Sequence, residues 1–102
     1  QRNYMLIHDN GWPNKACGDW FFDGVVTTRD DCAEKARQRN MTSFAYGRSH
    51  ANGRCYSESM HITQKYWDEF SVDREDPPCP DGKWHYNPFY DTYAINPKSV
   101  LR

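Results

Sequence analysis

The residues with the clearest potential for chemistry in this chain of 102 residues are its four cysteines, Cys17, Cys32, Cys55 and Cys79. Four cysteines in so short a chain are typical of two disulfides formed in an oxidising compartment. The competing chemistry is zinc binding. Zinc is disfavoured because no Cys-x-x-Cys or His-x-x-x-His pair occurs and the cysteines are widely spread. We therefore expect disulfides, no bound metal and no cofactor.

The other reactive side chains do not form a recognised catalytic set. The sequence contains no nucleophile elbow, phosphate-binding loop or zinc-protease motif. The four histidines are scattered: His8, His50, His61 and His85. The acidic neighbours Asp68 and Glu69 have side chains that diverge on either a helix or a strand, which does not suit a paired acid/base site. The sequence therefore predicts a protein that is not an enzyme.

An oxygen-rich calcium loop is a further alternative. It would be formed by four acidic residues, Asp73, Glu75, Asp76 and Asp81. These residues do not follow the order of an EF-hand, and two prolines interrupt them.

Charge and hydropathy exclude two classes of partner. The formal net charge is -1, and no stripe of Lys and Arg occurs, so we expect no nucleic acid. No apolar run approaches the length of a membrane span. The first residue, Gln1, would suit a mature end left by signal cleavage, although a fragment boundary would look the same. With the cysteines, the sequon Asn40-Met41-Thr42 supports an extracellular glycoprotein.

Aromatic residues replace most of the aliphatic ones in this chain. It has four Trp, seven Tyr and five Phe, which bury a large area per residue. We expect one domain with a thin aromatic core that needs covalent help. Four aromatic residues are expected to belong to that core: Trp20, Phe22, Phe44 and Tyr46.

A second aromatic group lies near the C-terminus and has two interpretations. It could cover an open face of a sheet, or it could form an interface for a sugar ring or a partner chain. Its members are Trp84, Tyr86, Phe89, Tyr90 and Tyr93. We expect about half of them to pack in the core and the rest to form an interface.

Local patterns predict a helix and a hairpin that would position the central cysteines. Thr28 and the acids after it form a capping-box-like start for a helix over residues 29–38. Cys32 and Ala36 share one face of that helix. Strands are expected over 41–47 and 54–57, joined by a loop with an Asn-Gly turn. A cysteine in the helix and one in the second strand could fasten the two elements together.

Other segments complete the predicted organisation. Residues 4–7 and 18–24 read as strands. Residues 61–72 fit either a helix or a strand, and the proline-rich residues 76–82 form a boundary.

These patterns together resemble the PAN/apple domain family. The family has Cys-x-x-x-Cys on a helix, Cys-x-x-Phe-x-Tyr on a strand and a cysteine on the next strand. Here Cys32 is followed by Ala36, and the strand reads Met41-x-x-Phe44-x-Tyr46. Both positions of the family's inner disulfide are therefore non-cysteine, which leaves an apolar contact in its place.

The resemblance implies two disulfides, Cys32 with Cys55 and Cys17 with Cys79. It also implies an α+β fold with one helix packed on a small twisted, mainly antiparallel sheet. It covers residues 17–79 and leaves an N-terminal flank or arm, 1–16, and an aromatic C-terminal flank, 80–102.

Two functional hypotheses follow. The first is a secreted, non-enzymatic module that binds protein or carbohydrate, as the resemblance implies. The second is a self-assembling subunit of an extracellular filament, matrix or coat, built through the flanking arms.

Overall fold

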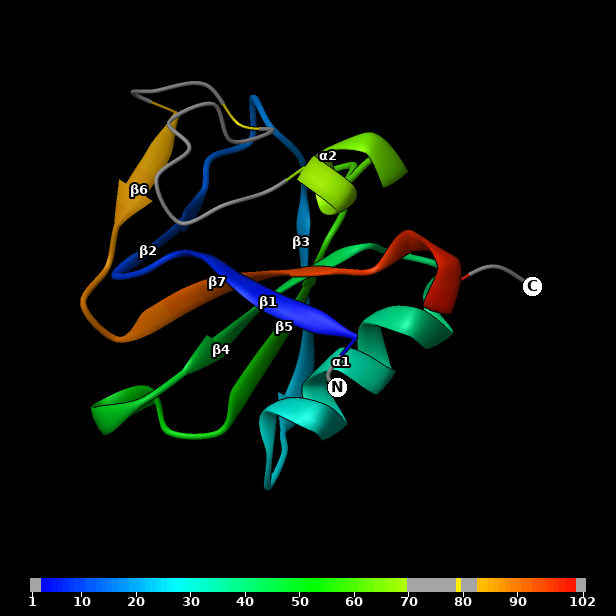
Figure 1. The fold of residues 1–102 in the computed structure, drawn as a ribbon. Helices are drawn as coiled ribbons and strands as arrows, with labels where there is room; N and C mark the ends of the chain where they lie inside the picture. Colours follow the sequence, from blue (N-terminus) through cyan, green and yellow to red (C-terminus); the bar gives the residue numbers. More distant parts are fainter. Residues whose placement is uncertain (1–2, 70–78, 80–82, 101–102) are drawn as a thin grey trace.

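The computed structural model describes residues 3–69, 79 and 83–100, and it confirms the predicted α+β class (Figure 1). One main helix, α1 (Arg29–Gln38), packs on a five-stranded antiparallel sheet. In spatial order the strands are β1 (Tyr4–His8), β7 (Tyr90–Ile95), β4 (Ser43–Gly47), β5 (Arg54–Glu58) and β3 (Trp20–Val25). A separate antiparallel ribbon pairs β2 (Gly11–Pro13) with β6 (Trp84–Tyr86). The short helices are η1 (Ser49–Ala51), α2 (Gln64–Glu69) and η2 (Pro97–Ser99).

The predicted helix is confirmed at both ends. The Thr28 side chain accepts a hydrogen bond from the backbone N–H of Asp31 at 3.1 Å, which satisfies one of the free donors of the first turn. After the helix, Asn40 adopts a left-handed conformation with φ of 59°. This conformation ends the helix, and Asn tolerates it better than most residues. Local sequence signals therefore determine where α1 begins and ends.

The helix is fastened to the sheet by the predicted Cys32–Cys55 disulfide, with the two Cα atoms 5.5 Å apart. Cys32 and Ala36 are fully buried on the face that meets the sheet. The Phe44 ring stacks on that of Tyr93 at 5.1 Å between centroids, and Tyr4 meets both rings edge-on. This side of the sheet holds the aromatic core that the composition predicts.

The predicted Cys17–Cys79 disulfide is also present and belongs to a second core on the other side of the sheet. That core contains Met60, Ile62 and Tyr66, the last from α2. The open interpretation of residues 61–72 is therefore resolved as helix for 64–69. Residues 70–72, like the four acids of the calcium alternative, lie outside the described residues.

Both predicted flanks contribute strands to the fold. β7 lies between β1 and β4, so the C-terminal segment occupies the interior of the sheet (Figure 1). In register, Tyr93 of β7 faces Leu6 of β1 on one side and Phe44 of β4 on the other. Among the described strands β1 pairs with β7 alone, so the N-terminal and C-terminal segments depend on each other for these backbone hydrogen bonds.

Removing residues 83–102 is expected to prevent folding. The truncation deletes β6 and β7, which leaves β1 without a partner and the Phe44 ring without its Tyr93 stack. Amide NMR dispersion and near-UV circular dichroism of the oxidised truncated chain should both be lost. Tyr86→Ser is the control that keeps the fold, because Tyr86 is 78% exposed. A folded truncated chain that merely fails to assemble would contradict this expectation and support the arm hypothesis.

Replacing Cys32 and Cys55 together with Ala should lower the free energy of unfolding by about 3 kcal/mol in the chain-entropy model. It should also speed amide hydrogen exchange throughout α1, because the bridge joins that helix to β5. Urea unfolding and hydrogen exchange measure the two effects. In the control variant, Cys17→Ala with Cys79→Ala, amide exchange in α1 should be slower than in the variant that lacks Cys32 and Cys55. Equal exchange in both variants would show that the bridge does not hold the helix.

Candidate functional site

The best candidate for a functional site is the outer edge of β3, at the border of the main sheet. β3 pairs with β5 on one side, and no other described strand pairs with it. Three large apolar side chains of this strand reach solvent: Phe21 is 38% exposed, Phe22 48% and Val25 68%. The register with β5 becomes irregular between Phe22 and Val25. Together with Arg39 and Arg54, described next, we call these residues the β3-edge surface.

Arg54 of β5 covers Phe22 on the face of the sheet away from α1. Its guanidinium carbon lies 4.4 Å from the ring centroid, which is a close cation–π contact. The group also donates hydrogen bonds to the hydroxyls of Tyr90, at 3.0 Å, and Tyr56, at 2.9 Å. The hydrogen bond to Tyr56 raises the pKa of Arg54 from its ordinary value, and a guanidinium is always charged in a protein. No carboxylate of the described residues forms an ion pair with Arg54.

Arg39 plays the matching part on the α1 side of the sheet. Its guanidinium carbon lies 5.4 Å from the centroid of Phe21. In contrast to Arg54, it has an acidic partner, because its Nε lies 2.8 Å from a carboxylate oxygen of Asp23. Asp23 also accepts a hydrogen bond from the Ser57 hydroxyl. Each exposed phenylalanine is thus covered by an arginine, and of the two arginines only Arg39 has a carboxylate partner among the described residues, through its Nε alone.

A cluster of stacked rings supports the β3-edge surface. Trp12 of β2 stacks on Trp20 of β3, with centroids 5.1 Å apart and planes 7° apart. It also stacks on Tyr90 of β7 at 4.6 Å. Tyr56 meets Trp12, Trp20 and Tyr90 edge-on. These rings therefore make their stacking contacts largely with one another, and the cluster forms a rigid support for Phe22 and Arg54.

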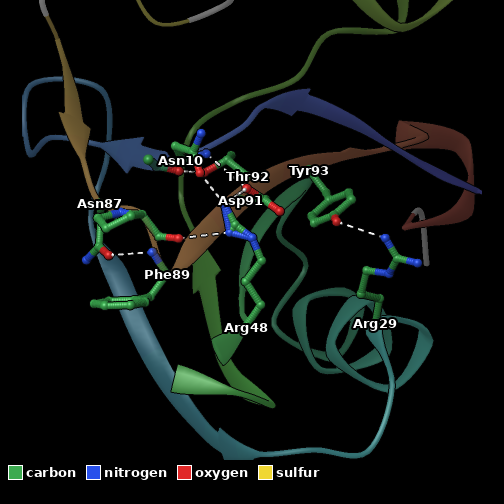
Figure 2. Close-up of polar contacts among 10 residues, drawn as sticks. Asn10, Arg29, Arg48, Asn87, Phe89, Asp91, Thr92 and Tyr93 are labelled. Carbon is green, nitrogen blue, oxygen red and sulfur yellow. Dashed lines mark hydrogen bonds and ion pairs between the residues drawn. The ribbon is translucent and has the colours of Figure 1, made fainter. Parts of the chain in front are cut away.

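Polar contacts among three loops hold this cluster in place (Figure 2). Arg48, just after β4, donates to the backbone oxygen of Pro88 at 2.9 Å and to the side chain of Asn10. It also lies 3.5 Å from Asp91, which accepts the backbone N–H of Asn10 at 2.9 Å. These contacts join the β1–β2 turn to the start of β7, which brings Trp12 and Tyr90 together. Farther along β7, Figure 2 shows Arg29 of α1 donating to the Tyr93 hydroxyl at 3.0 Å.

Two buried polar groups beneath the β3-edge surface have no hydrogen-bond partner among the described residues. They are the indole N–H of Trp20 and the carboxyl group of Glu58, which face each other across β3 and β5. Burial raises the pKa of Glu58 well above its ordinary value. The neutral carboxylic acid is therefore the favoured form in the folded protein, because an unpaired buried carboxylate is costly.

The five C-terminal aromatics, which we expected to divide between the core and an interface, lie in separate parts of the structure. Tyr93 and Tyr90 are buried in the two ring clusters described above. Trp84 stacks on His8 at 4.1 Å, and Phe89 meets His50 edge-on at 5.3 Å. Of the five, Tyr86 alone is a large exposed hydrophobic side chain. The structure thus distributes these residues between the ribbon and the main sheet.

Of the four predicted core aromatics, Phe44 is buried, whereas Trp20 and Tyr46 are partly buried. The placement of Phe22 in the core is wrong, because it is half exposed at the edge of the sheet. Adjacent residues of a strand point to opposite faces, so consecutive phenylalanines at 21 and 22 could not share one core. That signal was available in the sequence, whereas the two arginine contacts depend on tertiary structure. Asn40 of the sequon is exposed at the end of α1.

Comparisons with protein-family models, with curated proteins and with solved structures found no match to this chain. Within the described residues, no group of three or more His, Cys, Asp or Glu side chains could hold a metal ion. None of the described helices is long and apolar enough to cross a membrane.

The raised pKa of Glu58 predicts a particular pH dependence of stability. An unfolded Glu releases its proton at about pH 4.3, whereas Glu58 in the folded state keeps its proton to higher pH. The free energy of unfolding should therefore fall as pH rises above that value. The slope should reach at most about 1.4 kcal/mol per pH unit. Urea unfolding between pH 4.5 and 7.5 should show this slope for the wild type and a flatter one for Glu58→Gln. Glu69→Gln, at an exposed position, should keep the wild-type slope. Parallel curves for the wild type and Glu58→Gln would show that Glu58 does not stay protonated.

Proposed function

We propose that this chain is an extracellular, non-enzymatic module that binds an extended, acidic segment of a partner protein at the β3 edge. The observation that carries the proposal is an edge strand with exposed apolar side chains and no described partner on its outer side, beside an arginine that no carboxylate of the described residues neutralises. Extended peptides bind such edges by adding a strand, with backbone hydrogen bonds for affinity and side-chain contacts for specificity.

The backbone of β3 limits where a strand could be added. Natural edge strands are commonly protected by bulges, charges or short length. In β3 such protection begins at Asp23 and Gly24, where a charge and a register irregularity interrupt the strand. The regular stretch before them runs from Trp20 to Phe22. We therefore assign the partner's backbone contacts to this stretch, in which alternate residues direct their N–H and C=O groups away from β5.

The side chains around β3 indicate the composition of the partner. Alternate residues of an added strand face opposite sides of the sheet. On the side away from α1, an acidic residue would neutralise Arg54. On the α1 side, Arg39 already pairs with Asp23, so an apolar residue against Phe21 fits better. The favoured partner therefore alternates acidic and apolar residues.

A protein partner fits this surface better than the carbohydrate of the sequence-based hypothesis. Sugar rings bind open aromatic faces, whereas Trp12 stacks on two neighbours and Phe22 lies against Arg54. Assembly through flanking arms has no specific observation in its favour, because β1 and β7 pair within the chain. The two disulfides and the exposed Asn40 support an extracellular, glycosylated protein.

NMR titration with a capped peptide of alternating Glu and Val, eight residues long, tests the proposal. The amides of Trp20 to Phe22 should shift on binding, and affinity should fall at least about tenfold for Arg54→Gln, the loss of a charge-assisted contact. Phe22→Asp should abolish binding, because it removes an apolar contact and places a negative charge against the acidic residues of the peptide. Leu6→Asp, on the opposite edge strand and 47% exposed, is the matched control that should bind normally.

Two further peptides separate strand addition from simple charge attraction. A peptide of alternating Lys and Val should bind at least tenfold more weakly than the Glu peptide. Methylating alternate backbone nitrogens of the Glu peptide should also abolish binding, because it removes donors without changing the charge. Equal binding of the methylated peptide, or shifts confined to β1, would overturn the proposal. Binding of acidic or neutral oligosaccharides without any peptide binding would favour the carbohydrate hypothesis instead.

A further inference from the structure

A cavity of about 540 Å³ lies beyond the C-terminal end of α1, apart from the β3 edge strand. Three segments that are distant in the sequence line it: the connection between α1 and β4, the segment after β5 and the region of η2. Its volume falls in the range of about 300–1,000 Å³ that is usual for small-molecule sites.

The floor of the cavity is apolar and is held by hydrogen bonds. The apolar lining consists mainly of Met41, Met60, Ile62 and Val100. The Thr42 hydroxyl donates to the backbone oxygen of Met60 at 3.3 Å and accepts the backbone N–H of Ile62 at 2.9 Å. These bonds fix the backbone of the floor, while the flexible methionine side chains can adjust to a ligand.

The rim of the cavity favours a negatively charged group. Arg39 and His61 line it and are exposed, and none of the described lining residues is acidic. The ion pair of Arg39 with Asp23 uses Nε, and the described residues offer its Nη groups no hydrogen-bond partner. A carboxylate or sulfonate at the rim could therefore accept hydrogen bonds from Arg39 while its apolar body lies on the methionines.

We infer that this cavity binds a small amphipathic anion, with an apolar chain on the Met41 and Met60 floor and an acidic group at Arg39. The inference is independent of the strand-addition proposal. Arg39 contacts both sites, but Met41 and Met60 do not belong to the β3-edge surface, and Phe22 and Arg54 do not line the cavity. Variants at these positions therefore separate the two sites.

Decanoate below its micellar concentration is a suitable probe, and the methionine methyl groups are its reporters. The chain has three methionines, and Met5 does not line the cavity, so it is an internal control. In the wild type labelled with ¹³C-methyl methionine, saturable shifts are expected for Met41 and Met60 and not for Met5. Decyltrimethylammonium, with the same chain and the opposite charge, should bind at least tenfold more weakly.

Variants test the two halves of the site. Met41→Trp should fill the cavity and reduce decanoate affinity at least tenfold, whereas Leu6→Trp, at an exposed position outside it, should not. Arg39→Gln should weaken decanoate binding about tenfold, and Arg54→Gln is the matched change that should have no effect. Should Met41→Trp fail to fold, the wild-type methyl shifts and the Arg39→Gln comparison still decide the question. Absent or equal shifts at all three methionines, or equal affinity for the cationic probe, would overturn the inference.

Discussion

The Cys32–Cys55 bridge is the constraint on which most of the structure depends. The chain has nine Leu, Ile and Val residues, too few to hold a helix on a sheet by aliphatic packing alone. The bridge fastens α1 to β5 at a fully buried position. Because residues of a strand alternate between faces, fixing Cys55 toward α1 directs Arg54 and Tyr56 to the opposite face. The orientation of Cys55 therefore determines both the core beside α1 and the position of Arg54 beside the β3 edge.

Local elements could be predicted from the sequence because their signals are local. Thr28 and Asn40 mark the ends of α1, and their capping geometry is contained within a few residues. The disulfides followed from the resemblance to a family pattern. The place of β7 between β1 and β4 could not be predicted in this way, since it rests on pairing between positions such as Leu6 and Tyr93. Residues from both ends of the chain must be brought together before that pairing has any stabilising effect.

The candidate site was less predictable than the fold for a related reason. The sequence singled out aromatic residues by type and treated the C-terminal ones as a group. The structure separates them, because Trp84 belongs to the β2–β6 ribbon and Tyr93 to the interior of the main sheet. What distinguishes Phe22 is its contact with Arg54, a residue 32 positions away. Such a contact leaves no periodic trace in the sequence, and the consecutive phenylalanines at 21 and 22 indicate only that the two rings lie on opposite faces of the strand.

The two proposed sites meet at Arg39, and its geometry explains how one residue can belong to both. The residue follows the last turn of α1, so its backbone position is fixed by the helix that Cys32 anchors. From there its guanidinium stacks on Phe21 and pairs with Asp23 through Nε, while its Nη groups have no described partner. An anion in the cavity would use donors that the Asp23 pair leaves free, so the two contacts are compatible. The end of α1 thus places one permanent positive charge, that of Arg39, between the β3 edge and the apolar cavity. No acid of the described residues at either place pairs with all the donors of this guanidinium.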